Sequence, residues 1–194
     1  DEFIDTIKYA NEFLNENNEG ILTFGIKPNR AETGYGYINA NFNSKNKVNK
    51  VNAFVEKPDY ITAQKYLSDG NYYWNSGIFV WNIDFILNLI EKFLNDTYNA
   101  LSPILNLPFS EFEDFINENY KFTDSISIDY GVMEKYDNIF VIEGKFGWDD
   151  VGSWCSVDRY GEKDNNGNVL GSHGVLMKSK NNIILTKKKI LLNN

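Results

Sequence analysis

The chain has 194 residues, of which 42% are hydrophobic and 24% are charged, and its formal net charge is −8. This length and composition predict a globular α/β domain with a sizeable core, alone or with an appendage. The negative charge argues against nucleic-acid binding, which needs clustered Lys and Arg, and the one cysteine excludes an intrachain disulfide. No apolar run approaches the ~20 residues that span a bilayer. We therefore expect a cytoplasmic protein with neither a membrane nor a nucleic acid as partner.

The first 145 residues predict alternating helices and strands. Apolar residues at helical spacing indicate helices at residues 3–14, 61–67, 84–94 and 128–135, with two weaker helical pieces within 100–122. Strands are expected at residues 21–26, after Gly36, and at 48–55, 76–81 and 139–142. Asp59 is expected to cap the second helix and Gly70 to end it. The chain opens inside a helix with no strand before it, which for an α/β domain indicates a missing beginning.

Four stretches combine glycine or asparagine with a charge or an aromatic ring. They are TGYGYI (33–38), FVEKP (54–58), WNSGIF (74–79) and GWDDVGSW (147–154). Three of them lie at expected strand ends, so a parallel-rich sheet would bring them to one rim.

The first three stretches offer groups that suit a phosphorylated sugar. Gly34 and Gly36 let backbone N–H groups approach a ligand closely. Lys57 offers a point charge for a phosphate, and Glu56 accepts hydrogen bonds from vicinal hydroxyls. Asn75 both donates and accepts, which suits a sugar hydroxyl. Each residue alone also fits an ordinary bulge, turn or solvated strand end, and it is their joint occurrence that favours a ligand site.

The fourth stretch places two carboxylates between a strand and a helix. Residues 146–148 are expected to end a strand, and a helix is expected to begin near residue 153, so Asp149 and Asp150 fall where open α/β folds place their ligands. A carboxylate there suits a hard cation such as Mg²⁺ carried by a nucleotide phosphate. On this stretch alone, the alternative that both residues are turn and cap residues is equally well supported.

The character of the chain changes after Tyr160. A polar linker at residues 162–168 leads to short β-prone runs at 169–170, 175–177, 183–185 and 190–192. Their spacing indicates the coils of a β-helix or a small sheet. We therefore divide the chain into an α/β domain, residues 1–160, and the start of a small β-rich domain, residues 161–194.

The succession GIKPNRAETGYGYI, FVEKPDYITAQKYLSDGNYYWNSGIF and SIDYGVMEKYDNIFVIEGKFGWDDVGSW closely resembles mannose-1-phosphate guanylyltransferases of the long bacterial type. The resemblance runs continuously over residues 21–154, and this set of motifs is highly specific. It implies a Rossmann-like nucleotidyltransferase domain followed by a left-handed β-helix-like tail. The implied reaction forms GDP-mannose and pyrophosphate from GTP and mannose 1-phosphate with Mg²⁺.

The resemblance also implies roles for individual residues. Glu56 and Asn75 would hold mannose hydroxyls, and Gly36 would give a backbone contact to the sugar, with Gly34 also among the expected substrate-binding residues. Lys57 would meet the sugar phosphate. In the remaining motifs, Asp129 would support the sugar side and Asp150 would bind Mg²⁺, which makes Lys57 and Asp150 the candidate catalytic residues.

Two features of that family are absent from the sequence: the glycine-rich loop that cradles the triphosphate, and a later Asp that is the second Mg²⁺ ligand. We therefore expect a piece that lacks the N-terminal part and carries mainly the sugar-phosphate half of the site. Two alternatives stay open. One is a nucleotidyltransferase that uses UTP or dTTP with another hexose 1-phosphate, and the other is a non-catalytic sugar-nucleotide-binding or assembly subunit. A homo-oligomer is compatible with all three.

Overall fold

The computed structural model of the chain describes residues 1–42, 46–152, 154–171, 174–186 and 190–193. It contains two compact units, Asp1–Trp148 and Asp149–Asn194. The helix after residue 153 is therefore grouped with the C-terminal residues, whereas the sequence analysis placed it before the division at residue 160. The expected domain boundary stays a prediction.

The first unit is built on five strands that close into a barrel in the order β1-β4-β2-β3-β5. These strands are β1 (Ile21–Ile26), β2 (Tyr37–Ala40), β3 (Val48–Val55), β4 (Tyr72–Trp81) and β5 (Ile139–Glu143). Only the β1–β5 pair is parallel among the strand pairs of this unit that the described residues form. The expectation of a parallel-rich sheet is therefore wrong here, because β4 and β2 run antiparallel to their neighbours.

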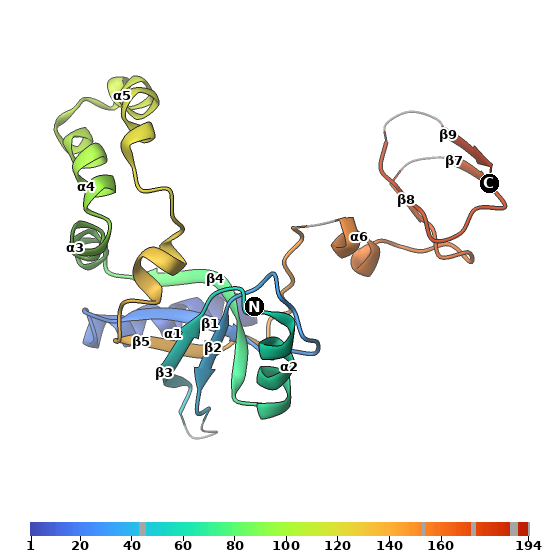
Figure 1. Cartoon of the computed structure of the whole chain (residues 1–194), viewed down its shortest axis with the longest axis horizontal. Helices are drawn as coiled ribbons and strands as arrows, with labels where there is room; N and C mark the ends of the chain where they lie inside the picture. The colour runs from blue at the N-terminus through green and yellow to red at the C-terminus, as the bar shows by residue number, and fades with distance from the viewer. Residues whose placement is uncertain (43–45, 153, 172–173, 187–189, 194) are drawn as a thin grey trace. The chain divides into compact units, whose positions relative to one another are not determined.

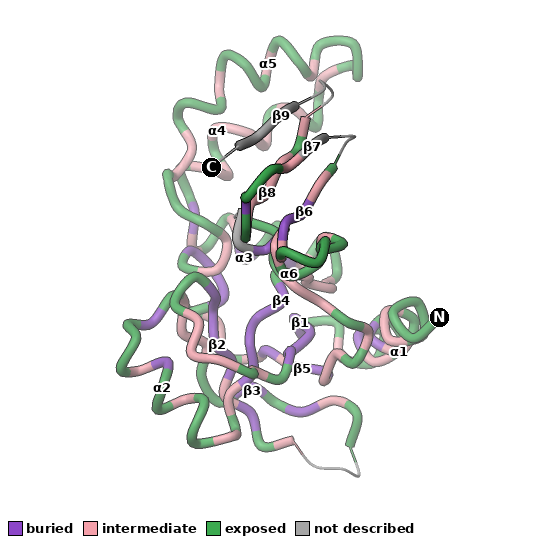
Figure 2. The backbone as a smooth tube through the Cα atoms, turned by 90° about the vertical axis from the view of Figure 1, so that its right-hand side faces the viewer, coloured by how far each residue is buried: buried purple, intermediate pink, exposed green. Residues whose placement is uncertain are grey.

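Strand β1 runs through the core of the barrel and contributes to all three apolar clusters. All six residues of β1 are buried, as in a strand that is covered on both faces, and Figure 2 shows the buried segments gathered on the strands. Helix α1 (Glu2–Glu16) covers one side and packs Ala10 and Leu14 against Leu22 and Phe24. Helix α2 (Tyr60–Asp69) buries Ala63 in another cluster beside Tyr37 and Trp74.

Helix α2 begins and ends where the sequence predicts. The Asp59 carboxylate accepts a hydrogen bond from the Thr62 N–H (2.7 Å), and Gly70 ends the helix with a left-handed backbone (φ 80°). The expected end of a strand at residues 146–148 is wrong. Pairing stops after Gly144 donates to the carbonyl of Gly25 (2.9 Å), and Gly147 then turns the chain with φ 67°.

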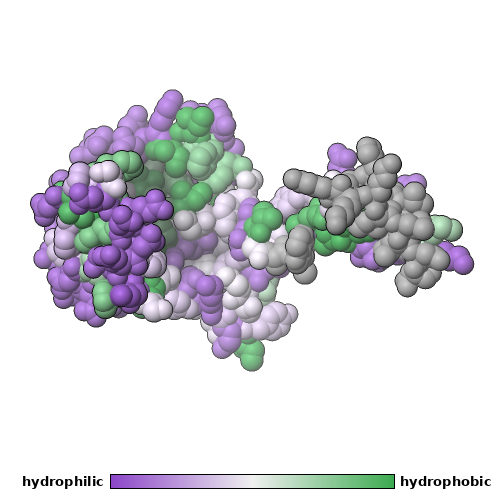
Figure 3. Space-filling model, turned by 90° about the horizontal axis from the view of Figure 1, so that it is seen from above, coloured by the Kyte–Doolittle hydropathy of each residue, from purple (hydrophilic) through white to green (hydrophobic). Residues whose placement is uncertain are grey.

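A run of short helices extends away from the barrel after β4 (Figure 1). It comprises α3 (Ile83–Phe93), α4 (Asn95–Leu101), η1 (Ser102–Asn106), η2 (Phe109–Glu111), α5 (Phe112–Asn119) and η3 (Tyr120–Phe122). Helix α3 is amphipathic and buries Ile86 and Leu89 in the main core cluster. The later pieces are mostly exposed, and apolar side chains reach the surface of this unit among polar ones (Figure 3). A single π-helical turn, η4 (Asp129–Met133), then returns the chain to the core.

The second unit contains helix α6 (Trp154–Tyr160) and four short strands. The strands are β6 (Val169–Leu170), β7 (Gly174–Met177), β8 (Ile183–Ile184) and β9 (Ile190–Asn193). They form two parallel pairs, β6 with β8 and β7 with β9. Asn168 is fully buried, and its side chain binds Asp164, the Ser179 carbonyl and Asn182. This network ties the residues before β6 to those before β8.

Candidate functional site

The carboxylate of Glu56 lies against the backbone of Gly36. Glu56 follows β3 and Gly36 precedes β2, and these two strands are antiparallel neighbours, so both residues lie at the same end of the pair. A Cβ atom at residue 36 would overlap with Oε2 of Glu56, so a larger residue there would require the Glu56 carboxylate to move. The Glu56 side chain is 8% exposed, and its Oε2 atom is buried without a hydrogen-bond partner. An acceptor buried in this way destabilises a fold unless a ligand or an ordered water donates to it.

Asn75 adjoins the same pair because β4 bulges there. Thr23 pairs with Phe79 and Gly25 pairs with Asn75. Between these two pairs, β1 contains one residue and β4 contains three. The extra residues include Gly77, whose φ of 71° bends the strand. The bulge directs the Asn75 side chain toward Asp129, and its Nδ2 donates to Asp129 Oδ1 (3.1 Å). The Asn75 backbone N–H also donates to the carbonyl of Gly36 (2.8 Å).

Lys57 carries the positive charge of this cluster. Its Nζ lies 3.3 Å from Oε1 of Glu56, and its side chain is half-exposed, so the ammonium sits at the surface end of the site. The backbone of Lys57 has φ 46°, an uncommon conformation for a residue with a side chain. The hydrogen bond to Glu56 raises the pKa of Lys57, so the amine stays protonated.

Glu56 itself is in an unfavourable place for a negative charge. Burial raises the pKa of Glu56, the nearby Asp129 and Glu134 raise it further, and Lys57 opposes the shift. A carboxylate with a raised pKa and an empty acceptor atom is a recognised mark of a functional site. The structure thus brings together five of the residues predicted from the sequence, namely Gly36, Glu56, Lys57, Asn75 and Asp129.

The sequence analysis missed two residues that touch this cluster. Glu134 accepts a hydrogen bond from the Glu56 backbone N–H (3.0 Å). Thr23 is fully buried, and its hydroxyl lies 3.1 Å from Oδ1 of Asn75. The signal for Thr23 was a lone hydroxyl inside the apolar strand ILTFGI. Glu134 gave no such signal, because an acid in a helical pattern normally faces solvent.

Gly34 is held differently from Gly36. Its N–H donates to Oε1 of Glu32 (3.2 Å), and it is exposed. Glu32 in turn pairs with Arg30 (3.2 Å), whose guanidinium lies over the Trp74 ring at 4.7 Å from its centroid. The loop before β2 is therefore fastened by its own side chains, and the role of Gly34 in ligand binding stays a prediction.

The two carboxylates of the second unit have different surroundings. Both oxygens of Asp149 are bound: Arg159 donates to them through two nitrogens (2.8 Å each), and the Tyr160 hydroxyl adds a third bond (2.8 Å). Asp150 is exposed, and among the described residues none donates a hydrogen bond to its carboxylate. Asp149 thus anchors helix α6, and the metal-binding role of Asp150 stays a prediction. The expected helix start at Ser153 lies outside the described residues.

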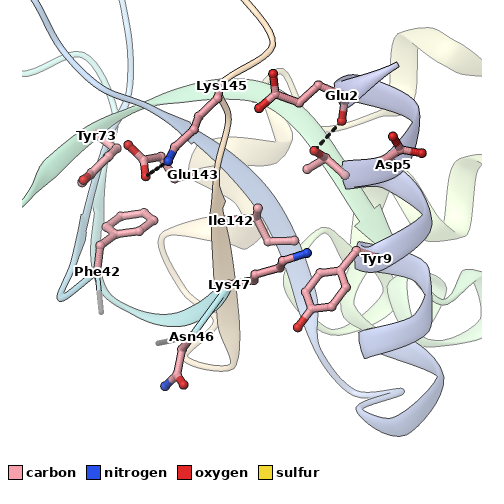
Figure 4. A pocket seen from close by; sticks show the side chains of 11 residues that line it. Glu2, Asp5, Tyr9, Phe42, Asn46, Lys47, Tyr73, Ile142, Glu143 and Lys145 are labelled. Atoms are coloured by element: carbon pink, nitrogen blue, oxygen red, sulfur yellow. Dashed lines mark hydrogen bonds and ion pairs between the residues drawn. The ribbon is translucent and has the colours of Figure 1, made fainter. Parts of the chain in front are cut away.

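Two cavities accompany the first unit. One, of about 740 Å³, is lined by α1 and by residues around β5, with the rings of Tyr9, Phe42 and Tyr73 (Figure 4). Its amines are engaged, since Lys47 lies over the Tyr9 ring and Lys145 pairs with Glu143 at 3.5 Å. It contains no predicted site residue. The other, of about 440 Å³, is lined by residues 50–54 and by Glu134, which links it to Glu56.

The described residues show neither a metal cluster nor a membrane-spanning helix. Within those residues no group of three or more His, Cys, Asp or Glu side chains is arranged to hold a metal ion. None of their helices combines the length and the apolar character that crossing a bilayer requires.

Comparison with known proteins places these residues in a family. A family model described as nucleotidyl transferase matches residues 1–166. Mannose-1-phosphate guanylyltransferase 2 of Escherichia coli O157:H7 is 37% identical over 199 residues, which cover 97% of this chain and 41% of that protein. The mannose-1-phosphate guanylyltransferase of Salmonella montevideo is 40% identical over 176 residues, covering 86% and 36%. The chain thus spans about 41% of the length of the first of these relatives.

Solved structures agree with this result. A crystal structure described as mannose-1-phosphate geranyltransferase from Thermus thermophilus matches with a TM-score of 0.76 and 30% identity, covering 98% of this chain and 55% of that one. Mannose-6-phosphate isomerase from Helicobacter pylori matches with a TM-score of 0.61 at 23% identity, covering 77% and 58%, which shows likeness of fold alone. The resemblance and the α/β nucleotidyltransferase fold expected from the sequence are both confirmed.

Proposed function

The chain belongs to the nucleotidyl transferase family, a family of transferases, and from this premise we propose that it carries the sugar-phosphate half of a mannose-1-phosphate guanylyltransferase site. In the proposed reaction, a phosphate oxygen of mannose 1-phosphate attacks the α-phosphate of GTP, which gives GDP-mannose and releases pyrophosphate. The names of the relatives support the choice of mannose and guanine.

The buried Oε2 atom of Glu56 is the observation that carries the proposal. It is an acceptor without a donor, next to Gly36, where the backbone lets a ligand come close. A carboxylate beside an amide can bind two neighbouring hydroxyls of a hexose. One hydroxyl donates to the carboxylate, and the other accepts from the amide. A bound sugar would satisfy Oε2 and remove the penalty of leaving it unpaired. Asn75 is placed to supply the amide.

The other residues of the cluster are proposed to act on the rest of the substrate. Lys57, at the surface end of the cluster, would pair with the sugar phosphate and hold its attacking oxygen in position. Asp129 would keep the Asn75 amide oriented toward the sugar. Gly36 would make the backbone contact, with Gly34 beside it in the same loop. The reaction needs no covalent intermediate on the protein, because orientation and charge neutralisation lower its barrier.

Asp150 is proposed to hold Mg²⁺. Its exposed carboxylate fits the preference of Mg²⁺ for one or two carboxylates together with substrate phosphates. When bound, the metal would neutralise charge on the phosphates. Asp149 does not fit this role, because Arg159 and Tyr160 already bind its two oxygens.

We further propose that residues 161–194 begin a left-handed β-helix-like domain. The parallel pairs β6–β8 and β7–β9 support this, since successive coils of such a solenoid stack parallel strands. The cytoplasm is the proposed location of the protein.

Turnover of the longest natural polypeptide that contains this sequence tests the function. Pyrophosphate release would be followed with mannose 1-phosphate and GTP, and with UTP, dTTP and glucose 1-phosphate exchanged one at a time. The proposal expects the highest kcat/KM for GTP with mannose 1-phosphate. A higher value for UTP or dTTP with another hexose phosphate would replace the substrates, and no turnover with any pair would favour a non-catalytic subunit.

A further inference from the structure

Thr23 occupies a special place in the barrel, opposite the β4 bulge. Its hydroxyl lies 3.1 Å from Oδ1 of Asn75 and 3.1 Å from the backbone carbonyl of Ile78. Ile78 belongs to the bulge, where the regular pairing between β1 and β4 is interrupted. The hydroxyl has a single proton, so Thr23 shares one donor between Asn75 Oδ1 and the Ile78 carbonyl. Thr23 is 0% exposed, so water does not replace this donor.

The surroundings of Asn75 permit only one orientation of its amide. The backbone N–H of Gly77 donates to Oδ1 (3.2 Å), and a backbone N–H acts only as a donor. On the other side, Asp129 is a carboxylate that accepts from Nδ2 (3.1 Å). The hydroxyl of Thr23 donates to Oδ1, which is consistent with the amide orientation that Gly77 and Asp129 require. A rotation of the amide by 180° would set donor against donor at Gly77 and acceptor against acceptor at Asp129.

We infer that Thr23 is a positioning residue that fixes Asn75 as a hydrogen-bond donor toward the bound sugar. Oδ1 faces the Gly77 N–H and the shared proton of Thr23, while one proton of Nδ2 goes to Asp129 and the second remains for a ligand. The site then offers one acceptor, Oε2 of Glu56, and one donor, Nδ2 of Asn75. The sugar hydroxyl next to Asn75 must therefore accept a hydrogen bond from Nδ2 and donate its own proton to another group. The orientation of Asn75 thus sets which sugar hydroxyl donates and which accepts.

This inference rests on the proposed function, because it assigns a role in binding the same sugar phosphate. It adds a residue that does not touch the ligand. Thr23 also differs from a residue that only supports the fold, since its effect should depend on the hydroxyl and not on the volume of the side chain.

The inference is tested with two pairs of proteins, each made as the full 194-residue chain, whose members differ by the hydroxyl at residue 23. The first pair compares wild-type Thr23 with Thr23→Val, which has nearly the same shape but places a methyl group next to Asn75 Oδ1. The second pair compares Thr23→Ser with Thr23→Ala, which removes the hydroxyl without adding that methyl group. For each protein, the Kd of mannose 1-phosphate is measured by calorimetry. The side-chain NH₂ resonances of Asn75 are recorded by ¹⁵N NMR and assigned by their loss in Asn75→Ala.

The inference expects Thr23→Val and Thr23→Ala to bind mannose 1-phosphate about 10-fold more weakly than their hydroxyl-bearing partners, in line with one lost buried hydrogen bond. In the free protein, the Asn75 NH₂ resonances should move or broaden in Val and Ala and stay near wild type in Ser. If Thr23→Val fails to fold, the Ser–Ala pair decides. Unchanged affinity and unchanged resonances in the hydroxyl-free variants would overturn the inference.

A matched variant separates this failure from failure of the proposed function. If Glu56→Ala abolishes binding while Thr23→Val and Thr23→Ala bind normally, the sugar site stands and only the role of Thr23 is wrong. If Glu56→Ala also binds normally, the sugar is not held by this cluster and both are wrong. The NMR comparison needs no ligand, so it reports on the orientation of Asn75 in either case.

Discussion

Gly36 and Glu56 are in direct contact across neighbouring strand ends, with the Glu56 carboxylate filling the volume that a β-carbon on residue 36 would need. The second glycine of the TGYGYI motif thus leaves room for one specific carboxylate.

The first prediction follows from that contact. Gly36→Ala should displace the Glu56 carboxylate and weaken mannose 1-phosphate binding at least 10-fold, about 1.4 kcal/mol, in calorimetric titrations. Gly34→Ala is the matched control, because a β-carbon there meets only Oε1 of Glu32 at an ordinary 3.5 Å. Equal losses in both variants would mean that the loop, and not the contact with Glu56, governs binding.

The second prediction concerns pH and the raised pKa of Glu56. The unfolded chain ionises Glu56 near 4.5, whereas the folded chain holds the proton to higher pH, so folding is opposed by this group once the pH rises above 4.5. Glu56→Gln removes the charge. It should therefore raise the free energy of unfolding at pH 7 and lose that advantage below pH 4.5. Urea titrations across this range measure the difference, and a Gln variant less stable than wild type at neutral pH would contradict the assignment.

The third prediction concerns the β4 bulge. Gly77 has a left-handed backbone (φ 71°), and a β-carbon there would meet nothing within 4 Å. The cost of Gly77→Ala is thus purely conformational, about 1 kcal/mol in the free energy of unfolding. Gly77→Asn should cost less, because Asn tolerates this conformation. Thermal unfolding compares the two, and an Ala variant as stable as wild type would show that the bulge is not constrained as described.

The fourth prediction separates the adjacent carboxylates. Asp149→Asn should destabilise the second unit by on the order of 1–2 kcal/mol, because it breaks a bidentate pair with Arg159. Asp150→Asn should leave stability unchanged and, in the longest natural polypeptide that contains this sequence, reduce Mg²⁺-dependent turnover by orders of magnitude. Chemical denaturation and pyrophosphate release measure the two effects. The reverse pattern would move the proposed metal ligand to Asp149.

Local signals in the sequence predicted much of this fold. Strand β1 and the Asp59 cap of α2 follow from apolar runs and capping chemistry, which depend on near neighbours only. The choice between Asp149 and Asp150 came from the family resemblance, and the structure adds that Asp149 is bound to Arg159. The metal-binding role of Asp150 stays a prediction.

The direction of the strands and the inner contacts of the site could not be predicted in this way. The β4 bulge depends on how Thr23 and Gly25 pair with residues about fifty positions away, and no local pattern encodes that register. Glu134 reaches the backbone of Glu56 only because a π-helical turn returns there. Such contacts arise from the closed barrel as a whole.

Calorimetric titration of mannose 1-phosphate into the 194-residue chain and its Glu56→Ala variant is the most direct test of the central claim. The account predicts saturable binding at one site of the wild-type chain, and affinity at least 10-fold lower in Glu56→Ala, because the buried acceptor is gone. Equal affinity in the two proteins, or no binding to either, would contradict a sugar-phosphate site built on Glu56.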